Sequence, residues 1–187
     1  MTIQTCKRCP ELAGSRTHIV IGSGPIPAPI VFLGDAPGKI EDKKGTPFCG
    51  TSGKYLRILI KKIGIPSKDY YLLNCIKCYP PDNRDPLKEE LINCLPFLKR
   101  QLNVLKPKLI VAMGKYAYSF CLQENPDEQI RVSKRAGTFV EVPHTKIGLA
   151  QPVMALLTFH PTFVLRNNSP GIDNKFRRHL QLAKDFI

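Results

Sequence analysis

Short apolar runs alternate with longer stretches of helical periodicity along this chain. The runs apolar enough to form buried strands are residues 29–34, 69–74, 107–114 and 152–159. Helical spacing of apolar residues predicts helices over 52–65, 85–106, 115–122 and 172–186. Strands that alternate with helices indicate an α/β fold, so we predict a three-layer α/β/α sandwich with a central, mostly parallel four-stranded sheet.

Two further features complete the predicted architecture. Residues 135–143 fit either another strand or an extended hairpin arm. No repeat, linker or low-complexity tract interrupts the chain, so residues 1–187 are expected to form a single domain.

The ends of two helices can be predicted from capping signals. Ser52 is the expected N-cap of the first helix, and Gly64 is expected to stop it. Its buried face should carry Leu56, Leu59, Ile60 and Ile63. For the second helix, Asp85 is the expected cap and Pro86 the first position, and Pro96 should kink or break it just after Cys94.

Polar residues directly follow three of the predicted strands. Asp35 follows the first run, Asn74 ends the second and His160 follows the fourth. Each could have a purely structural role, as a turn cap or as a histidine with all its hydrogen bonds satisfied. Ligands of open parallel sheets bind beyond the carboxyl ends of the strands, however, so the three together predict a binding site. The loop 34–53, rich in glycine and proline with acids and Phe48, is expected to line it.

Charge changes the picture of what could bind there. The chain has a formal net charge of +13, with Lys and Arg distributed from Lys7 to Lys184. Such an excess favours a polyanionic partner, nucleic acid first, although a solvated basic surface is the alternative. No apolar run reaches membrane-spanning length and the first ten residues are polar. We therefore expect no membrane association and an intracellular, cytoplasmic location.

Seven cysteines in an intracellular chain do not suggest a disulfide framework. Cys6 and Cys9 form a CxxC pair, while Cys78 and Cys94 flank a proline-rich loop. Together they form a candidate four-thiolate site, for which zinc and an iron–sulfur cluster are both suitable. The remaining three are expected to be small buried or half-buried apolar residues: Cys49, Cys75 and Cys121.

Four stretches of the chain resemble the motifs of the family 4 uracil-DNA glycosylases, in the same order. They are "GDAPGKIEDKKGTPFCGTSGKYL", "NCIKCYPPDNRDP", "NCLPFL" and "FHPTFVLR". The resemblance implies a base-excision repair enzyme that flips uracil out of DNA and hydrolyses its glycosidic bond. It also implies a structural 4Fe–4S cluster on the four cysteines Cys6, Cys9, Cys78 and Cys94.

The resemblance implies a role for each site residue. Phe48 would stack on the extruded uracil, and Asn74 would read its Watson–Crick edge, with Gly34 and Ala36 beside the base. Glu41 would lie near uracil C5 and help to exclude the methyl group of thymine.

The same resemblance assigns the chemistry and the contacts with DNA. His160 would donate to uracil O2 as negative charge develops, and Asp35 would have a water- or site-organising role. Asp35 departs from the family pattern, which has glutamate there, and Ala36 stands where the wider superfamily has aspartate. Arg84 and Arg166 are candidate contacts with phosphate or a groove of DNA, and for each the alternative is an exposed, solubilising charge. Residues 165–168 lie where relatives insert a loop into the duplex.

The sequence is also compatible with two other classes of protein. One is a non-catalytic uracil- or damaged-DNA-binding protein of the same fold, favoured by the Asp35 departure. The other is a zinc-ribbon-like nucleic-acid module, which leaves the placement of Asn74 and His160 unexplained. A related subgroup that is trapped covalently on its product has a histidine in a basic loop near residues 133–137. In this chain the nearest candidate, His144, lies well beyond that loop, so we expect ordinary turnover. We also expect the protein to be a monomer associated with the nucleoid. Strand preference and partner proteins are not predicted.

Overall fold

The computed structural model describes residues 3–125 and 132–187. Within them the strands are β1 (Ile30–Gly34), β2 (Tyr70–Asn74), β3 (Leu109–Met113), β4 (Phe139–Val142) and β5 (Val153–Thr158). They form one sheet in the order β2-β1-β3-β5-β4, in which only β4 is antiparallel to its neighbour. The α/β prediction is confirmed, but the predicted number of four strands is wrong. The fifth, β4, lies inside residues 135–143, where its pairing with β5 decides between strand and hairpin arm.

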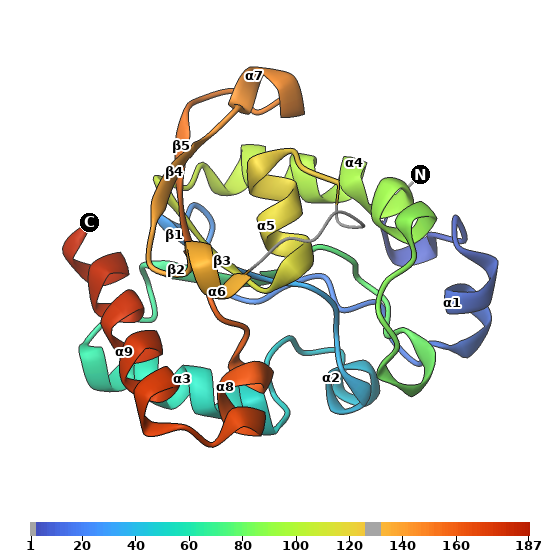
Figure 1. Cartoon of the computed structure of the whole chain (residues 1–187). Coiled ribbons are helices and arrows are strands. Elements are labelled where there is room, and N and C mark those ends of the chain that lie inside the picture. The colour runs from blue at the N-terminus through green and yellow to red at the C-terminus, as the bar shows by residue number, and fades with distance from the viewer. Residues whose placement is uncertain (1–2, 126–131) are drawn as a thin grey trace.

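Helices cover both faces of this sheet (Figure 1). The longer ones are α3 (Thr51–Ile63), α4 (Lys88–Leu105), α5 (Lys115–Leu122), α8 (Pro161–Asn167) and α9 (Pro170–Asp185). The shorter ones are α1 (Pro10–Ser15), α2 (Lys39–Lys44), α6 (Val132–Arg135), α7 (His144–Ile147) and the 3-10 turns η1 (Ile3–Thr5) and η2 (Pro81–Asn83). Figure 1 shows α3, α8 and α9 on one side of the sheet and α4 and α5 on the other, which confirms the three layers.

The sheet separates two hydrophobic clusters because successive residues of a strand face opposite sides. Ile30 and Phe32 of β1 pack with residues of α3 and α9, while Val31 and Leu33 pack with residues of α4 and α5. Every residue of β1 and β3 is buried. Continuous apolar runs are typical of parallel strands covered on both faces, which is why these strands could be predicted from the sequence.

Helix α3 ends as predicted but begins differently. Gly64 closes it in a left-handed conformation (φ 78°), and Leu56, Leu59 and Ile60 face the core. The N-cap is Gly50 rather than Ser52, because the backbone turns into the helix directly after the loop that Gly50 ends.

Helix α4 differs from its prediction at both Pro86 and Pro96. It begins at Lys88, so Asp85 and Pro86 lie in the preceding loop, because the Glu90 carboxylate reaches back to the Leu87 N–H at 2.8 Å and caps the helix there. The expected break is not observed, and α4 continues through Pro96. Pro96 lies on the exposed side of the helix, where water can satisfy the carbonyl that lacks its usual N–H donor.

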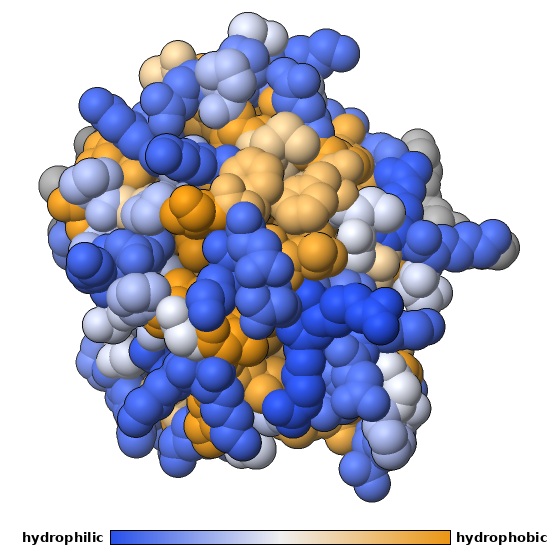
Figure 2. All heavy atoms as spheres, turned by 90° about the vertical axis from the view of Figure 1, so that its left-hand side faces the viewer, coloured by the Kyte–Doolittle hydropathy of each residue, from blue (hydrophilic) through white to orange (hydrophobic). Residues whose placement is uncertain are grey.

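The face of the molecule on which α9 lies is mostly polar (Figure 2). Figure 2, which views the side where α9 lies, shows hydrophilic side chains surrounding a smaller apolar area. Phe139 and Phe186, both partly exposed, stack with their ring centroids 5.4 Å apart. Among the described helices, none combines the length and apolar character needed to cross a membrane.

Candidate active site

The carboxyl ends of β1, β2 and β5 open into one cleft of about 750 Å³. Asp35, Asn74 and His160, which follow or end these strands, all line it. The cleft also brings in the remaining predicted site residues apart from Gly34 and the cysteines, namely Ala36, Glu41, Phe48, Arg84 and Arg166. The order of the strands thus places groups from positions 35 to 166 around a single space.

Asn74 presents an unused hydrogen-bond acceptor in this cleft. The residue is only 3% exposed, and its Oδ1 has no partner within the described residues. A buried polar atom without a partner carries a free-energy cost, so such atoms are concentrated where a ligand completes the set. Gly34 keeps this space open: a Cβ there would lie 2.6 Å from Asn74 Oδ1 and 2.8 Å from Phe48 Cζ.

Phe48 is held in a backbone conformation that a bulky residue rarely adopts. Its φ is 52°, and its ring is buried. Arg57 fixes the turn by donating from Nε to the Phe48 carbonyl at 3.0 Å and from Nη2 to the Pro47 carbonyl at 2.9 Å. Gly53 lets α3 approach, because a Cβ there would lie 2.2 Å from the Phe48 carbonyl carbon. Arg57 is not among the predicted site residues, because the helical spacing shows it only as a charge on α3.

Glu41 stabilises the loop between α2 and α3. Its Oε1 accepts the Gly50 N–H at 2.7 Å, and the carboxyl group is buried. Its Oε2 would lie 2.8 Å from a Cβ at Gly38. The carboxylate therefore fills the space between the two glycines that flank α2 and the following loop.

Asp35 lies at the N-terminus of α5. Its Oδ1 accepts the backbone N–H groups of Tyr116 and Ala117, both at 3.0 Å. Burial raises the pKa of Asp35 to about 7, against the opposing effect of these two hydrogen bonds. Gly114, at φ 102°, makes this contact possible, because a Cβ there would lie 2.3 Å from Asp35 Oδ2. Neither Gly114 nor Tyr116 could be predicted, since they are distant from Asp35 in the chain.

His160 is the N-cap of α8, and its hydrogen bond defines which ring nitrogen carries the proton. Nδ1 accepts the Thr162 N–H at 3.2 Å, so the proton of the neutral ring lies on Nε2. Burial and the nearby Arg166 lower the pKa of His160 to about 4. At neutral pH the ring is therefore an uncharged donor in the cleft.

The cysteines of the candidate cluster site gather beside α1 and the start of α4. Cys9, Cys78 and Cys94 pack with Leu12 and Ile76 in one small hydrophobic cluster. The other ligand candidate, Cys6, lies in electrostatic range of Cys9 and Cys78. Within residues 3–125 and 132–187, no three or more His, Cys, Asp or Glu side chains are arranged to hold one metal ion.

Hydrogen-bond donors surround these sulfur atoms. Arg16 Nη1 lies 3.4 Å from Cys78 Sγ, and Asn93 Nδ2 lies 3.6 Å from Cys9 Sγ. Burial raises the pKa of the Cys9 and Cys78 thiols, and these donors act against it by stabilising negative charge on sulfur, which an anionic thiolate cluster requires. The other cysteines match their prediction: Cys75 and Cys121 are buried and Cys49 is half-buried.

Arg84 is already engaged by carboxylates. Its guanidinium pairs with Glu90 through two hydrogen bonds of 2.7 and 3.0 Å and lies 3.3 Å from Glu11. Burial alone would raise the pKa of Glu90, but the hydrogen bonds from Arg84 and Leu87 outweigh it and lower that pKa. Arg84 thus ties the proline-rich loop to α4 and α1, whereas Arg166 is exposed at the rim of the cleft.

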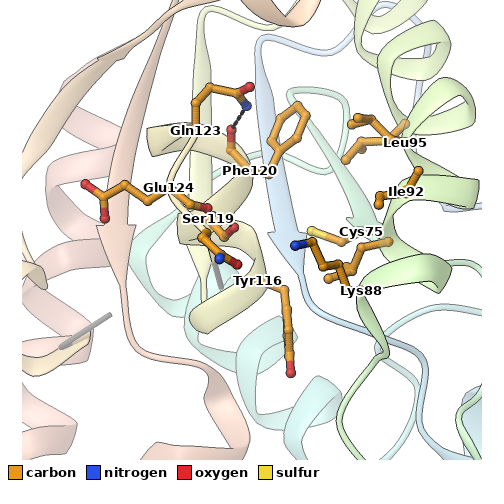
Figure 3. Close-up of a pocket in the computed structure, with 12 residues that line it drawn as sticks. Cys75, Lys88, Ile92, Leu95, Tyr116, Ser119, Phe120, Gln123 and Glu124 are labelled. Atoms are coloured by element: carbon orange, nitrogen blue, oxygen red, sulfur yellow. Dashed lines mark hydrogen bonds between the residues drawn. The ribbon is translucent and has the colours of Figure 1, made fainter. Parts of the chain in front are cut away.

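A second cavity, of about 390 Å³, lies between α4 and α5 (Figure 3). Apolar side chains of both helices, including Ile92, Leu95 and Phe120, point into it. It contains none of the predicted site residues, and only Tyr116 lines both cavities. We place the candidate active site in the larger cleft, where several polar groups converge.

The fold and the cleft agree with the comparisons. The model of the uracil DNA glycosylase superfamily matches residues 21–184. The type-4 uracil-DNA glycosylase of Thermotoga maritima is 36% identical over 185 residues, which cover 99% of this chain and 91% of the relative. Those of Archaeoglobus fulgidus and Sulfurisphaera tokodaii are 38% identical over 163 residues and 35% over 182; the matches cover 87% and 96% of this chain and 79% and 80% of those relatives.

The chain therefore belongs to the uracil-DNA glycosylase superfamily and, within it, to the type-4 uracil-DNA glycosylases.

Proposed function

We propose that this protein excises uracil from DNA by hydrolysing the N-glycosidic bond, which leaves an abasic site. The observation that carries the proposal is the unpartnered Oδ1 of Asn74, buried beside the Phe48 ring in a cleft that also contains the donor of His160. An apolar ring face, an amide and a neutral donor are what an extruded uracil needs.

Uracil recognition is assigned to the Asn74 amide and the Phe48 ring. Uracil has a donor at N3 and an acceptor at O4, which match the Oδ1 and Nδ2 of Asn74. Cytosine has the opposite pattern, so the same amide would reject it. The ring of Phe48 would stack on the base, and Gly34 provides the room between ring and amide. Exclusion of thymine is assigned to Glu41, whose carboxylate is already fixed by Gly50.

His160 is assigned to the departing base. As the glycosidic bond breaks, its electron pair moves onto uracil, and negative charge develops on O2. A neutral His160 that donates from Nε2 stabilises this charge without transferring its proton. The sugar passes through an oxocarbenium-like state, and water adds at C1′ and releases a proton, which balances the charge of the departing uracil anion.

Asp35 is assigned to the water. Its Oδ1 is held by two backbone N–H groups, which leaves Oδ2 as the oxygen available to accept a hydrogen bond from water. Aspartate at this position is one methylene shorter than glutamate, and α5 meets it directly. Asp35 therefore has two tasks: its Oδ1 holds the start of α5 at the site, and its Oδ2 can accept a hydrogen bond from water.

The cofactor is proposed to be a 4Fe–4S cluster held by Cys6, Cys9, Cys78 and Cys94. When bound, it supplies a covalent cross-link between the amino-terminal segment and the proline-rich loop. The donors Arg16 and Asn93 support the proposal, because they face two of the sulfur atoms. Anaerobically purified protein should contain about four iron atoms and four sulfides per chain. Stoichiometric zinc without iron would contradict this part of the proposal.

The substrate is proposed to be DNA inside the cell, bound by a monomer. The net charge of +13 supports a phosphate backbone as partner, and Arg166 at the cleft rim is the better placed of the two predicted arginine contacts. Arg84 is assigned to positioning the loop, since Glu90 occupies its guanidinium.

The decisive experiment uses matched oligonucleotides that contain uracil, thymine or cytosine at one position. Under single-turnover conditions, only the uracil strand should acquire alkali-labile sites. Tight binding of the uracil strand without any cleavage would instead identify the non-catalytic binder. Equal binding of all three strands without cleavage would remove uracil recognition altogether.

A further inference from the structure

Lys77 is a charged side chain enclosed by the protein. It is 1% exposed and lies between Asn74, at the end of β2, and Cys78. Burial of an ammonium group is costly unless hydrogen bonds and opposite charges compensate for it. The contacts of Lys77 therefore indicate why the chain keeps a lysine at this position.

The ammonium group of Lys77 donates to the backbone carbonyl of Asn74. Asn74 is the last residue of β2, which is an edge strand. In β2 the carbonyl of Asn74 points away from β1, because the N–H of Cys75 is the group that bonds β1, at Gly34, at 2.9 Å. On this outer side, Leu72 pairs with Ser23 in an isolated bridge. Two residues further on, the Lys77 side chain supplies the donor for the carbonyl of Asn74.

The other polar groups of Lys77 are fixed to different segments. Its backbone N–H hydrogen-bonds the thiol of Cys94, and its carbonyl accepts the Val20 N–H at 2.8 Å. The thiols of Cys75, Cys78 and Cys94 lie close enough to its ammonium to act on it electrostatically. Lys77 therefore spans from the cysteine site to the peptide that carries the Asn74 amide.

From these contacts we propose that Lys77 is the positioning residue for Asn74, and that it holds the base-reading amide from an anchor in the cysteine site. This inference rests on the proposed function. The structure shows no hydrogen bond at Oδ1 that would direct the Asn74 side chain, and Lys77 fixes the backbone from which this side chain extends, on the side where no strand does. A shift of this peptide would misplace the amide relative to the stacked base.

The test separates base reading from general DNA affinity. Two otherwise identical oligonucleotides carry either an uncleavable, sugar-fluorinated deoxyuridine or a stable abasic analogue. The ratio of the two dissociation constants reports the contribution of the base alone. In Lys77→Met this ratio should fall about tenfold or more, because a buried carbonyl loses a charged donor. Binding to the abasic strand and the iron content should stay near wild type.

Lys62→Met is the matched control, since it removes the same charge from an exposed position on α3. It should leave the ratio unchanged. If Lys77→Met does not accumulate as folded protein, Lys77→Gln, which keeps a donor on a shorter arm, should give an intermediate ratio. A wild-type ratio in a folded Lys77 variant, or equal weakening on both strands, would overturn the inference. Failure of both variants to fold would assign Lys77 to stability instead.

The outcome also distinguishes the inference from the proposed function. If the wild-type protein itself binds both strands equally, uracil recognition is wrong and Lys77 has no base reader to position. If the wild type prefers the uracil strand and Lys77→Met does so equally, only the positioning role is wrong.

Discussion

Replacement of His160 tests the chemistry most directly, because the two ring nitrogens have separate tasks. Nδ1 accepts the Thr162 N–H and caps α8, whereas Nε2 carries the proton that faces the cleft. His160→Ala removes both. His160→Asn keeps an oxygen that can cap α8, because asparagine is a favourable N-cap residue, but its donor lies on a shorter arm.

The expected magnitudes follow from these two tasks. Loss of a donor aimed at a developing oxyanion costs about 3–4 kcal/mol, so His160→Ala should cleave roughly a hundred- to a thousandfold more slowly. Loss of the cap should lower the free energy of unfolding by about 0.5–2 kcal/mol in His160→Ala, and by much less in His160→Asn. His160→Asn should therefore be nearly as stable as wild type, with an intermediate cleavage rate.

The assay is single-turnover cleavage of a uracil oligonucleotide, together with binding to an uncleavable uracil analogue and thermal unfolding. Binding should change much less than the rate, because the donor acts on charge that is absent from the ground state. Wild-type cleavage by His160→Ala would refute the assignment. So would a parallel loss of binding and rate in both variants, which would identify His160 as a docking or structural residue.

Three further perturbations test the rest of the site. Asn74→Asp should slow uracil excision about tenfold or more, because the carboxylate lacks the donor to O4 and repels the developing anion. The assay compares cleavage of uracil and cytosine strands under single-turnover conditions. Unchanged uracil excision would contradict base reading by Asn74. Asp35→Asn should have opposite effects on stability and rate. The pKa of Asp35 is raised to about 7, so protonation stabilises the folded state at low pH, and that stabilisation is lost as pH rises to about 7. The melting temperature of Asp35→Asn relative to wild type should therefore rise between about pH 4 and 7. The cleavage rate of the wild type should increase through pH 7, and the variant should lack that increase. Identical pH profiles of the cleavage rate in both proteins would remove Asp35 from the mechanism. Arg57→Met frees the carbonyl of Phe48 and should weaken inhibition by free uracil about tenfold, with the exposed Lys54→Met as control, and equal inhibition constants would show that Arg57 does not hold the ring.

Much of the fold could be predicted from the sequence because it depends on local pattern. The strands buried on both faces appear as continuous apolar runs, and Gly64 marks the end of α3. Asp35, Asn74 and His160 could be recognised as a group because parallel strands bring their carboxyl ends to one edge of the sheet. β4 was ambiguous because a short edge strand is defined by its partner β5, and its own burial pattern is mixed.

The tertiary structure alone decided the properties on which the proposed chemistry depends. The protonated nitrogen of His160 follows from one hydrogen bond to Thr162, and the raised pKa of Asp35 follows from its burial at the start of α5. The burial of Asn74 Oδ1 without a partner and the hydrogen bond from Lys77 to the Asn74 carbonyl likewise arise from packing. Residue types and their order determine which groups can meet. Desolvation and hydrogen-bond partners arise only when distant segments pack, and they set the charge, proton position and direction of each group.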